Sequence, residues 1–385
     1  MSESKVLIPT DPIWVKDSRQ LSELCAKWAQ QSAIAVDTEF MRTTTFFPKA
    51  ALFQVGDGEG CYLLDPLLIE DFTAFRSLMA NESVTKVMHS CSEDFEVFQT
   101  FLDVVPKPLF DTQLAAAFAG CGFSLGYARL VEQMLGIEVA KSETRSDWLQ
   151  RPLSASQMRY AALDVAYLPV IYGLLVKQLE SAGRLQWVRN DCAQLVAAAE
   201  QEFDPESYYI KIKSAWKLNR QQLAVLQMLA SWRECEARDR NIPRNRLIKE
   251  RTLWDMARIA PKDIQQLKRL EGMPPRTVSV DGAELLDIID QASRLPEEFC
   301  PQRLPRPLPP ESGDLMKALK LEQTETAERL GLAPEVLARK KDFELMVRGA
   351  LQGEEVYPDS FSGWRMELMG ERFASLLQAF IKESV

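Results

Sequence analysis

All of the β-strand signals in this sequence fall within its first 205 residues, and the rest of the chain has only helical patterns. Short apolar stretches bounded by turn residues are typical of strands, and there are four: Ala33–Phe40, Ala51–Val55, Cys61–Leu64 and Val84–His89. The helices expected in this region are Ser92–Leu102, Asp111–Ala119, Gly126–Leu135 and Ser156–Glu180. Consecutive strands followed by alternating strands and helices predict an α/β fold, with a mixed sheet and flanking helices.

The glycine-rich segment Gly56–Gly60 (GDGEG) separates the second and third expected strands. A short glycine loop between two strands predicts a β-hairpin. A phosphate-binding loop would have to lead into a helix, and here a strand follows instead. The segment is therefore interpreted as a turn and not as a nucleotide site.

Beyond residue 210, leucines recur at helical spacing from Leu218 to Trp232, until Pro243 interrupts the pattern. Further helices are expected at Arg246–Ile259, Pro261–Leu270 and Asp281–Leu295, and again within 314–380. Pro296–Gly313 contains six prolines, which predicts an extended connector. We therefore expect domains at 1–205, 206–295 and 314–385, joined by a proline-rich linker at 296–313. The two helical segments are similar in length and could be two copies of one module.

The charge of the chain is distributed unevenly. It has 46 Lys+Arg and 55 Asp+Glu, a net charge of −9, and an acidic total argues against binding to a polyanion such as nucleic acid. Residues 206–295, however, hold 17 basic and 12 acidic residues. This basic module is a candidate for binding nucleic acid, with an ordinary charged helix surface as the alternative. Its candidate residues are Arg233, Arg238, Arg240, Arg244, Arg246, Lys249 and Arg251.

Three features limit the chemistry and the compartment. His89 is the single histidine, which excludes sites that need several histidine ligands. The seven cysteines include no C-x-x-C pair, as expected for reduced thiols of a cytoplasmic protein. The first 14 residues lack the basic-then-apolar pattern of a secretory signal. The longest apolar run, Val165–Val176, is too short for a membrane span and contains Pro169, so we expect a buried helix.

Two carboxylates interrupt the first strand. Asp37 and Glu39 are two residues apart and so point to the same face of the strand, whereas their neighbours Ile34, Val36 and Phe40 are apolar. Burying two carboxylates without a compensating charge costs several kcal/mol. Either a metal or a basic partner neutralises them, or they lie on the solvent-facing side of an edge strand.

Further acidic candidates lie later in the chain. Tyr160 and Asp164 are four residues apart and share one face of a helix, although a surface Asp beside a half-buried Tyr is the alternative. Asp94 stands at the start of a helix, where a capping role is the alternative. If the four carboxylates converge, two divalent cations would neutralise them. Oxygen ligands favour Mg²⁺ or Mn²⁺ over zinc, and two such ions suit in-line phosphoryl displacement.

The order of these motifs resembles the DEDD exonuclease superfamily, in its Tyr-containing branch. The segment D-T-E at Asp37–Glu39 resembles its first motif, H-S-C-S-E-D with Asp94 its second, and Y-A-A-L-D at Tyr160–Asp164 its third. The stretch Lys141–Ser154 is similar to the segment that precedes the third motif in the ribonuclease D family. Residues 216–273 resemble an HRDC domain, and 314–380 is similar to the second HRDC-like domain of that family.

The resemblance implies a ribonuclease H-like exonuclease domain followed by two small all-α HRDC-type domains. It implies that Asp37 bridges two metals, that Glu39 and Asp164 hold the one nearer the attacking water, and that Asp94 supports the other. Tyr160 would orient the nucleophilic water. The implied reaction removes nucleotides one at a time from an RNA 3′ end, releases 5′-monophosphates and contributes to trimming of tRNA precursors.

Other residues are weaker candidates. His89, Lys141 and Arg145 could contact substrate, but a hydrogen-bonded structural histidine and a solvated basic loop are the alternatives. Phe46 and Phe47 could stack on RNA bases or pack in a core. A DNA exonuclease and a non-catalytic RNA-binding protein remain alternative functions, although the second would be expected to lack one of the acidic residues. We expect no membrane and no obligate protein partner.

Overall fold

The computed structural model describes residues 8–139, 143 and 146–384. The chain forms two compact units, each built from separate stretches of sequence. The sheet unit contains the chain up to Met41, Ala50–Glu200 and the chain from Leu308 onward. The helical unit contains Arg42–Lys49 and Gln201–Pro307.

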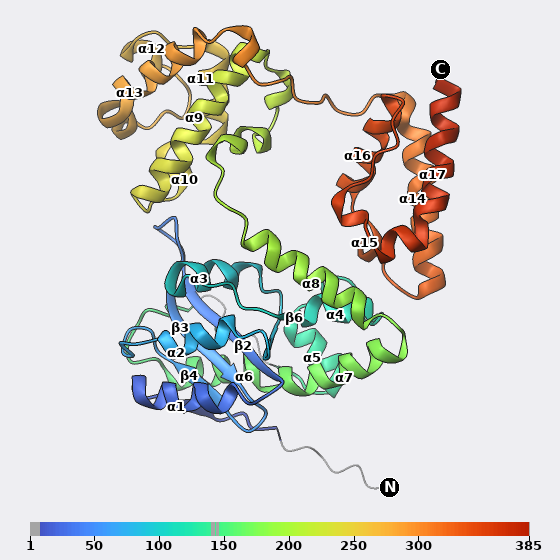
Figure 1. The fold of residues 1–385 in the computed structure, drawn as a ribbon. Helices are drawn as coiled ribbons and strands as arrows, with labels where there is room; N and C mark the ends of the chain where they lie inside the picture. The colour runs from blue at the N-terminus through green and yellow to red at the C-terminus, as the bar shows by residue number, and fades with distance from the viewer. Residues whose placement is uncertain (1–7, 140–142, 144–145, 385) are drawn as a thin grey trace. The chain divides into compact units, whose positions relative to one another are not determined.

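A six-stranded mixed sheet organises the sheet unit (Figure 1), in the order β1-β4-β3-β2-β5-β6. The strands are β1 (Pro12–Trp14), β2 (Ala33–Met41), β3 (Lys49–Gly56), β4 (Cys61–Leu64), β5 (Thr85–Met88) and β6 (Leu109–Asp111). Strands β3 and β4 form the expected antiparallel hairpin, with Gly56 opposite Cys61. The pairs β1–β4, β2–β5 and β5–β6 are parallel. The prediction of a mixed sheet is therefore confirmed, and β2 lies in its interior.

Helices pack against both faces of the sheet because consecutive residues of a strand point to opposite sides. On β3, Phe53 packs against Phe72, Phe75 and Phe98, whereas Leu52 belongs to a cluster with Trp148. The helices of this region are α1 (Ser18–Trp28), α2 (Thr73–Ala80), α3 (Ser92–Leu102), α4 (Thr112–Phe118), α5 (Tyr127–Leu135), α6 (Ala155–Ala166), α7 (Leu168–Ser181) and α8 (Leu185–Ala199).

The continuous stretch Ala155–Ser181 is long and apolar enough to cross a membrane. It consists of α6 and α7, which meet at Tyr167. Most of its buried residues, among them Val165, Ile171 and Leu175, belong to the main core cluster of the sheet unit. The expectation of a buried helix at this position is therefore confirmed.

The C-terminal helices complete the sheet unit. They are α14 (Gly313–Leu330), α15 (Pro334–Leu337), α16 (Lys340–Leu351) and α17 (Trp364–Ser384), with two short 3₁₀ turns at Pro310–Ser312 and Asp359–Phe361. Trp364 stacks on Trp187 of α8 with ring centroids 4.6 Å apart. Arg365 donates two hydrogen bonds to Asp191, at 2.8 and 2.6 Å. The C-terminal residues thus share a core with the sheet.

The helical unit consists of α9 (Arg220–Asp239), α10 (Arg244–Leu247), α11 (Glu250–Ile259), α12 (Ile264–Lys268) and α13 (Pro275–Ser293), with 3₁₀ turns at Pro205–Lys211, Ala215–Lys217 and Glu297–Phe299. The helices α9, α10 and α11 are respectively long, four residues long and of medium length, as are α14, α15 and α16 of the sheet unit. Each series ends in a long helix, α13 or α17. The connection Arg42–Lys49 packs here, with Phe46 against Ala237 and Leu247. The amides of Phe46 and Phe47 both donate to Asn241 Oδ1 at 3.0 Å.

Candidate active site

The interior strand β2 carries two of the four candidate carboxylates. Asp37 and Glu39 lie in its second half, each partly exposed, whereas Thr38 between them is buried. Strands β3 and β5 flank β2 in the sheet. The alternative of an edge strand that turns its acids to solvent is therefore excluded, and the two carboxylates need another source of compensation.

Helix α3 brings the third carboxylate beside β2. Because β5 runs parallel to β2, the carboxyl ends of both strands meet at one edge of the sheet, and α3 starts just beyond β5. Ser90 takes a left-handed conformation (φ 61°) in the connecting turn. Asp94 follows in the first turn of α3, only 8% exposed, and Thr38 donates its hydroxyl hydrogen bond to Asp94 Oδ1.

Helix α6 supplies Tyr160 and Asp164. Its start is fixed by a capping box, in which Ser154 accepts from the amide of Gln157 and the Gln157 side chain accepts from the amide of Ser154. The helix then passes close to the end of β3. A Cβ atom placed on Gly56 would lie 2.6 Å from the backbone oxygen of Val165, so only glycine permits this approach.

Three of these carboxylates form a compact acidic group. Asp37, Glu39 and Asp164 each offer an oxygen within 4.8 Å of the others. Asp94 lies outside this group but is close enough to influence all three electrostatically. A set of carboxylate oxygens at this spacing is the donor chemistry that hard divalent cations prefer, so these residues could hold a metal.

The charges of the cluster are unbalanced without a cation. Burial, together with Asp164 and Asp94, raises the pKa of Glu39 to about 9, and burial with Asp94 raises the pKa of Asp164 to about 8. Burial also raises the pKa of Asp94 to about 7, despite the hydrogen bond from Thr38. Burial and the three neighbouring carboxylates hold the pKa of Asp37 well above its usual range. Such shifts are typical of functional sites.

Tyr160 stands beside the cluster as a neutral phenol. Burial and the charges of Asp164 and Glu39 raise its pKa, so its hydroxyl remains a hydrogen-bond donor at physiological pH. Its ring packs against Trp148, with centroids 6.0 Å apart. Arg151 fixes the loop that contains Trp148. It donates hydrogen bonds to the backbone oxygen of Trp148 at 2.8 Å and to both carboxylate oxygens of Asp65 at 2.6 and 2.8 Å.

Sequence reasoning missed Thr38, Trp148 and Arg151 as supports of the site. Thr38 stands between two motif residues, and Trp148 and Arg151 lie in the stretch 141–154 quoted above. Their positions within these motifs could have indicated a role, but the sequence does not show which residues they contact. A hydroxyl aimed at Asp94 and a guanidinium shared with Asp65 depend on segments that are distant in the sequence.

The structure places the weaker candidates as follows. His89 lies at the end of β5, partly exposed, and both ring nitrogens have partners: Thr112 Oγ1 at 2.9 Å and the oxygen of Leu125 at 3.1 Å. Lys141 and Arg145 lie outside the described residues. Phe46 is buried in the helical unit, under the guanidinium groups of Arg238 and Arg244.

Most of the basic candidates of residues 206–295 have intramolecular partners. Arg240 pairs with Asp281 at 2.7 Å, Arg244 with Glu234 at 2.5 Å and Arg251 with Asp255 at 2.9 Å. Arg233 is 3% exposed. Much of the positive charge counted in the sequence is thus used within the unit.

Comparison with known proteins identifies the family. A profile of the 3′-5′ exonuclease family matches residues 12–180, and a profile of the HRDC domain matches residues 222–289. A ribonuclease D of Pseudomonas paraeruginosa is 47% identical over 95% of this chain and 97% of its own length. The chain belongs to the ribonuclease D family. It is therefore a 3′→5′ exoribonuclease, as the motifs predicted.

Other relatives agree in sequence and in fold. Ribonuclease D of Escherichia coli is 37% identical over 94% of this chain and 96% of its own length. The crystal structure of E. coli RNase D, described as an exoribonuclease involved in structured RNA processing, superposes with a TM-score of 0.89 at 35% identity, covering 96% of this chain and 99% of that one. The predicted fold, an exonuclease domain followed by a helical HRDC region, is confirmed.

Proposed function

We propose that the acidic cluster holds two divalent cations, Mg²⁺ or Mn²⁺, and that the chain removes nucleotides one at a time from RNA 3′ ends, releasing 5′-monophosphates. The observation that carries this proposal is the group of Asp37, Glu39 and Asp164 on β2 and α6, whose oxygens lie within 4.8 Å of one another. Burial and repulsion by the neighbouring carboxylates raise the pKa values of all three groups. Four carboxylates would balance two divalent ions.

The residues of the cluster would divide the work of binding and orientation. Asp37 would contact both ions, Glu39 and Asp164 one of them, and Asp94 the other, with Thr38 fixing the Asp94 carboxylate. When bound, the ions would lower the pKa of water and stabilise the leaving oxygen. Tyr160 would donate its hydroxyl hydrogen bond to orient the attacking water. Its raised pKa favours this positioning role over proton abstraction.

We infer that the substrates are structured RNAs with a free 3′ end and that tRNA precursors are among them. The E. coli relative is described as acting in structured RNA processing. A cytoplasmic location fits seven cysteines that are all free thiols. Contacts of His89, Lys141 and Arg145 with substrate stay predictions, as does the reading of residues 314–385 as a second HRDC-like domain.

One assay tests the proposed reaction. A 3′-extended tRNA and a single-stranded DNA of matched sequence would be incubated with Mg²⁺, Mn²⁺ or EDTA, and the products resolved by length. We expect stepwise shortening of the RNA that stops in EDTA and yields 5′-monophosphates. Preference for DNA would replace the proposed substrate, and cleavage that survives EDTA would remove the role of metal.

The Asp37→Asn variant tests the assignment of the cluster. Removing one charge from the residue that would contact both ions should abolish turnover, while the melting temperature without metal stays equal or rises. A matched control is Asp71→Asn, since Asp71 is an exposed acid outside the cluster. Near-normal turnover by Asp37→Asn would contradict the assignment.

A further inference from the structure

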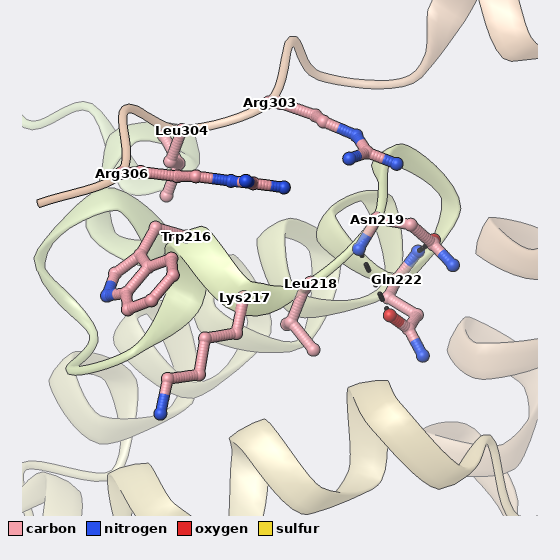
Figure 2. A pocket seen from close by; sticks show the side chains of 8 residues that line it. All are labelled: Trp216, Lys217, Leu218, Asn219, Gln222, Arg303, Leu304 and Arg306. Carbon is pink, nitrogen blue, oxygen red and sulfur yellow. Dashed lines mark hydrogen bonds between the residues drawn. The ribbon is translucent and has the colours of Figure 1, made fainter. Parts of the chain in front are cut away.

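A pocket in the helical unit lies between the start of α9 and the proline-rich segment that follows α13 (Figure 2). Its volume is about 520 Å³, within the range of cavities that bind small ligands. The residues that line it are Trp216, Lys217, Leu218, Asn219, Gln222, Arg303, Leu304 and Arg306. In Figure 2, Arg303 and Arg306 extend from the proline-rich segment, and Trp216 and Asn219 lie across from them, whereas the side chain of Lys217 points away from the two arginines.

The arginines of this pocket are carried by an anchored segment. Arg220 donates to the backbone oxygen of Cys300 at 2.8 Å and to that of Pro301 at 3.3 Å. Leu304 packs against the apolar core of the helical unit. The segment is thus fixed at Cys300 and Pro301, before Arg303, and at Leu304, between the two arginines. Arg303 and Arg306 are therefore held at the pocket wall, and this part of the proline-rich stretch forms part of a binding surface.

The cations of the pocket are not paired with any carboxylate in the part of the chain that the structure describes. Among the described residues, no carboxylate forms an ion pair or hydrogen bond with the side chains of Lys217, Arg303 or Arg306, and no acidic residue lines the pocket. This contrasts with Arg240 and Arg244 of the same unit, which are paired at 2.7 and 2.5 Å. The side chains of Lys217, Arg303 and Arg306 are therefore available to an external anion.

An aromatic surface adjoins these cations. Trp216 is partly exposed, and the ammonium group of Lys217 lies 5.4 Å from the centroid of its ring. The capping box of α9 already uses the amides of Asn219 and Gln222, so the side-chain cations, and not the helix end, remain for an anion. An indole face beside several unpaired cations is the combination that binds single-stranded nucleic acid, through base stacking and phosphate contacts.

We propose that this pocket binds one nucleotide of a single-stranded stretch of the RNA substrate, with its base on Trp216 and its adjacent phosphates on Arg303 and Arg306. The volume admits a single base with its phosphates. The site uses none of the metal-binding carboxylates and belongs to the other unit of the chain. It extends the proposed function by giving the exoribonuclease a second RNA contact away from its chemistry.

Binding of RNA without cleavage tests the site directly. Full-length protein in EDTA would be titrated into a 5′-labelled single-stranded 12-mer, and affinity read by fluorescence anisotropy. We expect Trp216→Ala to weaken binding about tenfold and Trp216→Phe to retain most of it, because phenylalanine still stacks. The double variant Arg303→Glu/Arg306→Glu should weaken binding at least tenfold. It should also reduce the slope of log affinity against log salt by about 1.4, since each lost phosphate contact on a single strand accounts for about 0.7.

Matched controls separate this pocket from general charge. Arg269→Glu and Arg276→Glu alter exposed arginines of the same unit that do not line the pocket, and together they should leave the affinity within about twofold. Melting curves would establish that each variant is folded. Wild-type affinity in both pocket variants, or equal losses in the controls, would overturn the proposal.

Two further experiments identify the ligand of the pocket and separate this proposal from the proposed nuclease function. A glutamate-rich peptide that displaces the RNA as well as unlabelled RNA does, and is insensitive to Trp216→Ala, would favour an acidic protein partner and overturn the RNA assignment. Cleavage of a trinucleotide with Mg²⁺ should be unchanged in the pocket variants. Absence of that cleavage in the wild-type protein would count against the proposed function, whereas intact cleavage with unaltered RNA affinity would count against the pocket alone.

Discussion

The carboxyl group of Glu39 makes the stability of the metal-free protein depend on pH. Burial and the neighbouring acids raise its pKa to about 9, so the folded, metal-free protein retains a proton there that the unfolded chain releases near its ordinary value of about 4.3. The folded state then binds more protons than the unfolded state between these values. The contribution of Glu39 to the free energy of unfolding therefore falls as the pH rises from about 4 to about 9.

The variant Glu39→Gln tests this effect. In EDTA at pH 9, it should be more stable than the wild type by about 1 kcal/mol or more, because one unfavourable charge is gone. The difference should vanish near pH 4, and added Mg²⁺ should stabilise the wild type more than the variant. Denaturant unfolding at several pH values is the measurement. A pH-independent difference would contradict this account.

Tyr160 can be tested by removing only its hydroxyl. Tyr160→Phe keeps the ring that packs against Trp148 but cannot orient a water, so kcat should fall about 100-fold with little change in stability. Tyr172→Phe is the control, because Tyr172 packs its ring against Phe110 away from the acidic cluster. Single-turnover cleavage of a short RNA would decide, and an unchanged rate for Tyr160→Phe would exclude the positioning role.

At the scale of the elements, local patterns located the interior strands and the helix α3 well. Residues Ser92–Leu102 were predicted and observed as one helix. The three-residue strands β1 and β6 were not predicted, because Pro12–Trp14 and Leu109–Asp111 are too short to show a period and are defined by their partners. Likewise, Arg246–Ile259 was expected as one helix, but Ile248 is extended and separates α10 from α11.

The sequence also identified the residues of the cluster better than their surroundings. Spacing alone placed Asp37 and Glu39 on the same face of a strand, and Tyr160 and Asp164 on the same face of a helix, because the two residues of each pair are close in sequence. Whether β2 is an edge or an interior strand depends on pairing with β5, which no local pattern encodes. The hydrogen bond from Thr38 to Asp94 could not be predicted from a local pattern either, because the two residues are 56 positions apart.

The approach of α6 to β3 gives a prediction for this scale. Gly56→Ala would place a methyl group 2.6 Å from the oxygen of Val165, which must push α6 and its Asp164 away from β2. We expect activity to fall at least tenfold and stability to fall by about 1–3 kcal/mol. Gly173→Ala is the control, because a Cβ atom there meets nothing within 4 Å and alanine favours the helix. Equal behaviour of the two variants would contradict the steric argument.

At the scale of the whole molecule, the sheet unit is completed by the last part of the chain. Trp364 and Arg365 contact Trp187 and Asp191 of α8, so a truncation after residue 205 would expose a core surface as well as remove the helical domains. Such a truncation would confuse loss of RNA binding with loss of folding. Point variants of the two units are the cleaner way to separate their roles.

The ion pair between Arg365 and Asp191 can be used to measure how much the C-terminal helices contribute to the stability of the sheet unit. Both side chains are 11% exposed, so Asp191→Ala would leave a buried guanidinium without its carboxylate and lower the free energy of unfolding by about 3 kcal/mol. Asp290→Ala breaks the exposed pair with Arg294 and should cost less than about 1 kcal/mol. Denaturation midpoints of the two variants would be compared, and equal shifts would show that the C-terminal helices add little.

The connection Arg42–Lys49 has a consequence for how the protein is made. It follows the strand that carries Asp37 and Glu39, yet Phe46 packs against Ala237 and Leu247, which a ribosome adds about two hundred residues later. Trp187 must similarly wait for Trp364. Neither unit can therefore finish folding during early synthesis, and contacts of such long sequence separation form slowly. The nascent chain is therefore expected to complete the core of the sheet unit only once nearly the entire chain has left the ribosome.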